Sequence, residues 1–136
     1  MASIDDDAQR ITVFREVDVE RAVRTARSAA DRLGFDRIGA ESVALAASEL
    51  ARNLLRYATD GVLTIREIAD RGLEIESNDT GPGIGDVALA LAGRHGGGKS
   101  LGDGLGAVRR LMSEFEISTS PTGTCIKARR WPTAPF

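Results

Sequence analysis

The sequence contains few of the residues on which several common classes of site depend. Its one cysteine, Cys125, cannot form an internal disulfide. Aromatic residues make up 4% of the chain, fewer than the stacking platforms for single-stranded nucleic acid need. The 18 basic and 20 acidic residues are spread along the chain, and a net charge of −2 gives no electrostatic footprint for DNA or RNA. We therefore do not expect nucleic-acid binding.

Long apolar runs are also missing. The longest, at residues 87–92, is far shorter than the roughly 18 residues that a membrane-spanning helix needs. The first twenty residues are acidic rather than basic and then apolar, so we expect no secretion signal and a cytoplasmic location. At 136 residues and 42% apolar, the chain has the size of one domain with its own core. We expect a single domain over residues 1–136, with loose tails at 1–9 and 132–136.

The order of the predicted elements indicates an α+β fold. Polar and apolar periodicity and turn residues predict, in chain order, a strand at 10–16, helices at 19–33 and from 37 to about 58, strands at 62–68 and 73–76, a short helix at 86–92, a helix at 105–114, and strands at 115–118 and 124–131. Asp18 and Asp36 are the expected N-caps of the first two helices, and Gly34 is the expected left-handed stop. Because helices and strands do not alternate regularly, we expect a two-layer sandwich, a mostly antiparallel sheet with helices on one face.

Seven of the fifteen glycines lie between residues 93 and 106, in the stretch GRHGGGKSLGDGLG. Gly93 and the later Gly98-Lys99-Ser100 satisfy the Walker A pattern of a P-loop. A P-loop, however, precedes a helix, and the glycines at 102, 104 and 106 would each cost that helix about 1 kcal/mol. We expect such a helix scarcely to form, and the later strand, FEISTS, lacks the terminal aspartate that would bind magnesium. The P-loop interpretation is therefore disfavoured.

Glu49 and Asn53 are spaced four residues apart on the second predicted helix, at the border of its apolar face. That face comprises Val43, Ala46, Leu50, Leu54 and Tyr57. A carboxylate at a half-desolvated border can accept a proton, and a neighbouring amide oxygen suits magnesium. Taken alone, the pair is better explained as polar residues flanking a buried face.

Two further motifs follow. In the heptapeptide NDTGPGI at 78–84, Asp79 can accept a hydrogen bond from an exocyclic amine such as that of adenine, and Gly81 and Gly83 let the backbone approach a flat ring. The alternative is an ordinary turn. The stretch GDGLG at 102–106 opens a helix whose free amides can hold phosphate oxygens, and its alternative is a flexible linker.

In this order and spacing, the three motifs resemble the N, G1 and G2 boxes of the GHKL ATPase superfamily, which includes sensor histidine kinases, type II topoisomerases and Hsp90. The stretch SELARN at 48–53, with Tyr57-Ala58, looks most similar to the small serine/threonine kinases of bacterial partner-switching modules, the RsbT and anti-sigma-factor type. The likeness extends from about residue 10 to residue 131. Two departures are Asn78, where this branch is expected to carry a carboxylate, and the basic residues Arg94, His95 and Lys99 in the loop.

The resemblance implies roles for individual residues. Glu49 is implied as the catalytic base and Asn53 as the magnesium ligand. The residues implied to bind ATP are Asp79, Gly81, Gly83, Ile84, Lys99, Gly102, Gly104, Leu105, Gly106 and Thr124. Of these, Asp79 and Thr124 are implied at the adenine and the backbone of 102–106 at the phosphates. Residues 93–101 are expected to form a mobile lid, in which Lys99 either reaches the γ-phosphate or is a solvated charge.

The implied activity is that of an ATP-dependent serine/threonine kinase acting with Mg²⁺. With no acceptor domain in 136 residues, the ATP-binding module is expected to act on a separate protein. The resemblance implies an acceptor of the STAS (anti-sigma-antagonist) type, with a PP2C-type phosphatase or a sigma factor as further partners, in bacterial stress signalling of the stressosome kind. The alternative is a non-catalytic, ATP-bound switch that sequesters a partner.

Overall fold

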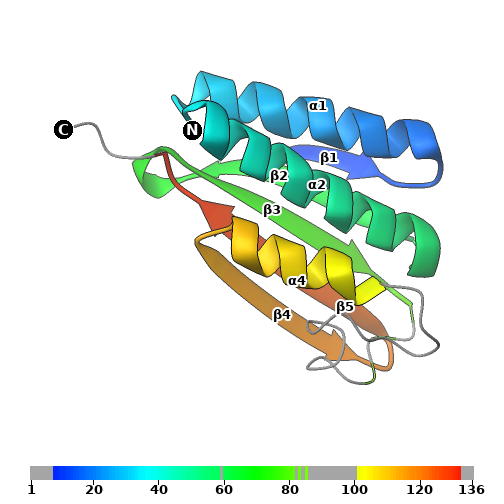
Figure 1. Ribbon diagram of the computed structural model, residues 1–136. Coiled ribbons are helices and arrows are strands. Elements are labelled where there is room, and N and C mark those ends of the chain that lie inside the picture. The colour runs from blue at the N-terminus through cyan, green and yellow to red at the C-terminus, as the bar shows by residue number, and fades with distance from the viewer. Residues whose placement is uncertain (1–7, 59, 82, 84, 86–100, 133–136) are drawn as a thin grey trace, which may run out of the picture.

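A computed structural model describes residues 8–58, 60–81, 83, 85 and 101–132 (Figure 1). The elements are β1 (Gln9–Thr12), α1 (Glu16–Arg32), α2 (Arg37–Tyr57), β2 (Val62–Ile68), the 3-10 turn η2 (Ala69–Arg71), β3 (Gly72–Asp79), α4 (Leu101–Leu111), β4 (Glu114–Ser120) and β5 (Gly123–Arg130). The strands form one antiparallel sheet in the order β1-β2-β3-β5-β4. The helices cover one face of this sheet (Figure 1). The predicted two-layer α+β fold is confirmed.

The core lies between the helices and the sheet. The predicted apolar face of α2 is buried at Val43, Ala46, Leu50 and Leu54. Alternate residues of the strands meet it, because neighbouring side chains of a strand point to opposite faces. The buried apolar residues of the strands are Ile11, Leu63, Ile65, Leu73, Ile75, Ile126 and Ala128. Among the described residues, no helix is long and apolar enough to cross a membrane.

The α1–α2 hairpin has the stop and cap predicted between its helices, but α1 begins earlier than expected. Gly34 has a φ of 88°, and Gly39 N donates to Asp36 Oδ1 at 2.7 Å. Asp18 is not the N-cap of α1: it lies in the first turn and accepts hydrogen bonds from the backbone N of Phe14 and Arg15. These bonds hold the pKa of the Asp18 carboxyl below its ordinary value. The strand before α1 is correspondingly shorter than predicted.

Helix α4 corrects one prediction. It begins at Leu101 rather than at residue 105, and it contains Gly102, Gly104 and Gly106, where a helix was expected scarcely to form. Three glycines cost a helix about 3 kcal/mol relative to alanine. Burial of a leucine and a valine contributes about 1.5–3 kcal/mol each, and Leu105 and Val108 are fully buried. Tertiary packing against α2 therefore outweighs local propensity.

The remaining bounds differ by smaller amounts. Strand β3 continues to Asp79, three residues beyond its predicted end, because its pairing with β2 and β5 continues. The predicted turn at 70–72 is instead the 3-10 turn at Ala69–Arg71. The closing hairpin is present: β4 extends beyond its predicted bounds at both ends, and β5 is shifted by one residue toward the N-terminus. The predicted helix at 86–92 and the predicted lid at 93–101 lie outside the described residues, except for Leu101, which is the first residue of α4.

Candidate functional site

Glu49 and Asn53 lie on α2 with half-buried side chains, at the predicted border of its apolar face. The first turns of α4 pack directly against them. A Cβ placed on Gly104 would lie 2.8 Å from Glu49 Oε2 and 3.5 Å from Asn53 Oδ1. The structure therefore brings the first and third predicted motifs together, across about fifty residues of sequence.

Asp79 ends β3 and lies beside β5, where it pairs in register with Thr124. Asp79 Oδ1 accepts a hydrogen bond from Gly81 N at 2.8 Å, which fixes the orientation of the carboxylate. Thr124 is buried, and its Oγ1 lies 2.9 Å from Thr119 Oγ1 on β4. A shallow hollow of about 200 Å³ lies at this end of the sheet, lined by Asn78, Asp79, Ser118, Thr119, Ser120, Thr122, Gly123, Thr124 and Cys125.

The loop after β3 is held against the β4–β5 turn by glycines. Gly83 has a φ of 85°, and a Cβ there would overlap the carbonyl oxygen of Ser120. A Cβ on Gly123 would overlap the carbonyl oxygen of Asp79. Real Cβ atoms do not approach backbone this closely, so both positions require glycine for the observed packing. The sequence motif identified Gly83 but missed Gly123, whose only signal was its place in a turn sequence.

Asn78, the residue that departs from the expected carboxylate, has a local explanation. Its Nδ2 donates a hydrogen bond to the carboxylate of Glu76, which also accepts one from Arg66 Nη1 at 2.6 Å. Burial opposes ionisation of Glu76, but these hydrogen bonds outweigh it and hold the pKa of its carboxyl below the ordinary value. A carboxylate at 78 would instead face Glu76 with a like charge. The amide is thus the side chain that suits this neighbour.

Of the other predicted residues, some lie outside the described residues and the rest lie in α4. Ile84 and Lys99 lie outside the described residues, as do Arg94 and His95. Gly102 lies in the first turn of α4, and Gly106 is buried. The side chain of Leu105 is only 1% exposed, so this residue can offer a ligand its backbone but not its side chain.

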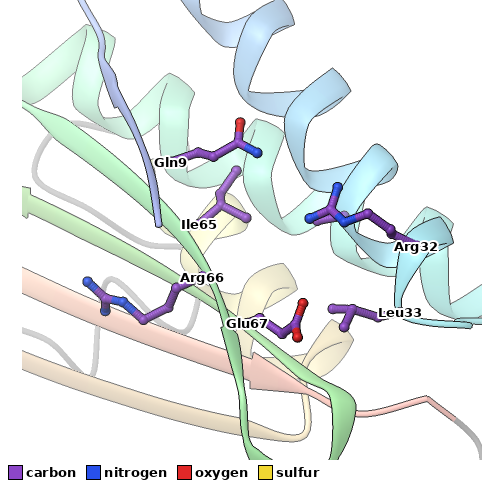
Figure 2. Close-up of a pocket in the computed structure, with 7 residues that line it drawn as sticks. Gln9, Arg32, Leu33, Ile65, Arg66 and Glu67 are labelled. Carbon is purple, nitrogen blue, oxygen red and sulfur yellow. The ribbon is translucent and has the colours of Figure 1, made fainter. Parts of the chain in front are cut away.

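A second hollow, of about 350 Å³, lies between the C-terminal end of α1 and strands β1 and β2 (Figure 2). It is lined by Gln9, Ala29, Arg32, Leu33, Ile65, Arg66 and Glu67. In Figure 2 the side chains of Arg32 and Arg66 lie on opposite sides of β2. Arg66 donates hydrogen bonds to Glu74 and Glu76. This hollow contains none of the predicted site residues.

Comparison with known proteins decides between the Walker A and the GHKL interpretations of the glycine-rich stretch at 93–106. The family model of the histidine kinase-like ATPase domain matches residues 13–130. The chain belongs to the histidine kinase-like ATPase family. This assignment confirms the resemblance inferred from the three motifs, and it leaves the Walker A match at 93–100 as a coincidence of sequence.

Within this family, a relative and two solved structures define the likeness further. The serine/threonine-protein kinase RsbT of Bacillus subtilis is 37% identical over an alignment of 130 residues, and the match covers 93% of this chain and 98% of RsbT. The structure of the RsbU and RsbW domains of Rv1364c from Mycobacterium tuberculosis has a TM-score of 0.67 at 19% identity, covering 94% of this chain and 33% of that longer one. The SiaB–SiaC complex from Pseudomonas aeruginosa has a TM-score of 0.63 at 14% identity, covering 90% of this chain and 87% of the matched chain. The two structures share the fold.

Proposed function

We propose that this chain transfers the γ-phosphoryl group of ATP to a serine or threonine of a STAS-domain protein in the bacterial cytoplasm. The observation that carries the proposal is the likeness to RsbT over nearly the full length of both chains. The enzyme class, serine/threonine-protein kinase, follows from that likeness and the family match. The identity of the acceptor as a STAS domain is the further step. In the SiaB–SiaC complex the matched chain, which has the same fold, is bound to another protein, and this supports a protein partner.

The contact between α2 and α4 supports the phosphate end of the proposed site. The free amides in the first turn of α4 would hold phosphate oxygens, because a helix N-terminus carries partial positive charge. Asn53 would hold Mg²⁺, which takes few protein ligands where phosphates supply the rest. When bound, Mg²⁺ neutralises charge on the phosphates. Glu49 would accept the proton of the acceptor hydroxyl while the hydroxyl oxygen bonds to the γ-phosphorus and ADP leaves.

The end of β3 supports the adenine end. Asp79 would accept a hydrogen bond from the exocyclic amine, with Thr124 beside it on β5. Gly81, Gly83 and Ile84 would border the ring. Gly83 and Gly123 let this loop pack closely against the β4–β5 turn. The Asp79 carboxylate would therefore be held in place before the nucleotide binds. Lys99 is proposed as a lid residue that approaches the phosphates.

Replacing Gly104 by alanine should impair phosphoryl transfer without destabilising the fold. The added methyl group would lie 2.8 Å from Glu49 Oε2, and the carboxylate, at the end of a flexible side chain, would move. Alanine is favoured over glycine in a helix by about 1 kcal/mol, so the melting temperature should not fall. Because even a 1 Å displacement of a catalytic group can cost up to about 100-fold, we expect the transfer rate to fall about tenfold.

A double-mutant cycle tests the mechanism of this effect. If Gly104→Ala acts by displacing Glu49, it should add almost nothing to the loss caused by Glu49→Gln. Independent, additive losses would show that the alanine acts elsewhere, for example on the amides of α4.

The experiment that tests the proposed function is incubation with γ-labelled ATP, Mg²⁺ and each STAS-domain protein encoded by the same organism. We expect label on a serine or threonine of at least one of them, and removal of that label by a PP2C-type phosphatase from the same organism. ATP-dependent binding of a STAS protein or a sigma factor without any labelled product would instead favour the non-catalytic switch.

A further inference from the structure

The solvent-facing side of α2 carries apolar side chains where polar ones are expected. Its exposed or half-exposed positions, spaced three or four residues apart, form what we call the α2 crest: Ile38, Glu41, Leu45, Ser48, Arg52 and Arg56. Ile38 is 73% exposed and Leu45 is 52% exposed. They are seven residues apart, two turns along one helical face.

The other large exposed apolar side chains belong to the same region. Phe14, just before α1, and Val17, in its first turn, are 68% and 41% exposed. Single exposed apolar residues are common on protein surfaces. In the part of the chain that the structure describes, however, all four lie on the α1–α2 hairpin or at its entry, and none lies on the sheet or on α4. Their restriction to this helix pair points to it as an interaction surface.

Two ion pairs place these residues along one ridge. Arg27 of α1 forms an ion pair with Glu41 of α2, and Arg52 Nη1 lies 3.6 Å from Glu16 Oε1. Residues 16 and 27 of α1 are eleven positions apart, and so are residues 41 and 52 of α2. Both ion pairs therefore fit one antiparallel alignment of the two helices. Val17 therefore lies beside the Arg52 end of the crest, and the four apolar side chains are spread from one end of the helix pair to the other.

The charge around these apolar residues is positive. In α1 and α2, seven exposed arginines stand against four exposed carboxylates; the buried Asp18, which pairs with Arg21, and the half-buried Glu49 bring the net charge of the two helices to +1, whereas the whole chain has a net charge of −2. The arginines are residues 21, 24, 27, 32, 37, 52 and 56, and the carboxylates are residues 16, 20, 31 and 41. A partner that matches this surface is acidic at its edge and apolar at its centre.

The crest is also continuous with the proposed transfer site. Leu45 precedes Glu49 by four residues, so their side chains are neighbours on α2, about 5–6 Å apart at Cβ. A protein seated on Leu45 has its surface within one helical turn of the proposed catalytic base. Resting on the proposed function, we infer that the α2 crest is the docking face for the protein substrate, and that the substrate meets it with an apolar patch rimmed by acidic residues.

The test uses the STAS-domain protein that the labelling experiment identifies, with the double variant Ile38→Ser/Leu45→Ser. We expect its KM for the STAS protein to rise at least tenfold, while its KM for ATP and its melting temperature stay unchanged. Leu45→Met, which keeps the apolar volume, is the matched control and should stay within twofold of the wild type. Arg52→Gln should raise the KM for the STAS protein several-fold at low salt and reduce the dependence of that KM on salt.

Other outcomes overturn the inference. An unchanged KM for the STAS protein in the double serine variant would do so directly. If the serine substitutions left that KM unaltered but abolished co-sedimentation with vesicles of anionic lipid, the crest would bind a membrane. If they abolished self-association instead, it would bind a second copy of the chain. Failure of the proposed function gives a different result. If the wild type binds a STAS protein without labelling it, the Kd of that binding is measured by calorimetry in place of KM. The double serine variant should then raise this Kd at least tenfold. If no STAS protein binds, both proposals fall.

Discussion

Replacing Glu49 by glutamine should leave ATP binding intact and lower the rate of phosphoryl transfer by about two to four orders of magnitude. Glutamine has the shape of glutamate, so it keeps the packing beside Gly104 and the half-buried position at the edge of α2. Its amide cannot take the proton of the acceptor hydroxyl. The substitution therefore removes the proton acceptor and little else.

Two measurements separate binding from transfer in this variant. Calorimetry gives the Kd for ATP, and single-turnover labelling at saturating STAS protein gives the rate of transfer. Glu20→Gln, which neutralises an exposed glutamate on α1, is the matched control and should change neither quantity. A Glu49→Gln enzyme that transfers phosphate at the wild-type rate would remove Glu49 from the role of base.

Replacing Asp79 by asparagine should weaken ATP binding by about 100-fold or more. Asp79 Oδ1 already accepts a hydrogen bond from Gly81 N, so a carboxylate can offer its second oxygen to the adenine amine. Asparagine has only one acceptor oxygen. If that oxygen keeps the bond to Gly81, the ligand meets an NH₂ group opposite its own amine, and a buried polar pair is left unmade. Losing a hydrogen bond to a charged acceptor costs about 1.5–3 kcal/mol, and the unpaired donor adds to this.

Calorimetric titration of ATP into the Asp79→Asn protein is the direct measurement. Asp60→Asn is a suitable control, because Asp60 is an exposed carboxylate whose Oδ2 lies 3.5 Å from Thr80 Oγ1, next to the same loop. This control should bind ATP within a few-fold of the wild type, and thermal melting checks that both variants fold. Normal ATP affinity in Asp79→Asn would contradict the assignment of the nucleotide site as a whole.

Local signals were sufficient to predict most of the fold. The apolar residues of α2 from Val43 to Leu54 repeat with the period of one helical face, and Val43, Ala46, Leu50 and Leu54 are all buried. Gly34 and Asp36 have the stop and cap roles that their residue types favour. The prediction failed at α4, where glycines argued against a helix and contacts with α2 stabilise one. Asp18 was misplaced because the same residue type serves both as an N-cap and as a partner for backbone N–H groups within the first turn.

The site was predicted in part, for a related reason. The spacing of Glu49 and Asn53 on one helix is a local property, and their half-buried position is confirmed. The contact of Gly104 with both residues depends on the packing of two helices far apart in sequence, which no spacing rule contains. Gly123 was missed because its close approach to the carbonyl oxygen of Asp79 crosses from one strand to another. The preference for an amide over a carboxylate at position 78 depends on the hydrogen bond that Asn78 donates to Glu76, which no sequence pattern predicts.

Helix α2 presents three separate sets of residues to three different surroundings. Leu50 and its neighbours face the core, Glu49 and Asn53 face α4, and Ile38 and Leu45 face solvent. On the proposed docking role of the α2 crest, substitutions in the third set change partner recognition while the first two sets keep stability and chemistry, so gene duplicates of this chain can diverge in the partner they recognise. Several such enzymes can then operate in one cell without phosphorylating each other's substrates.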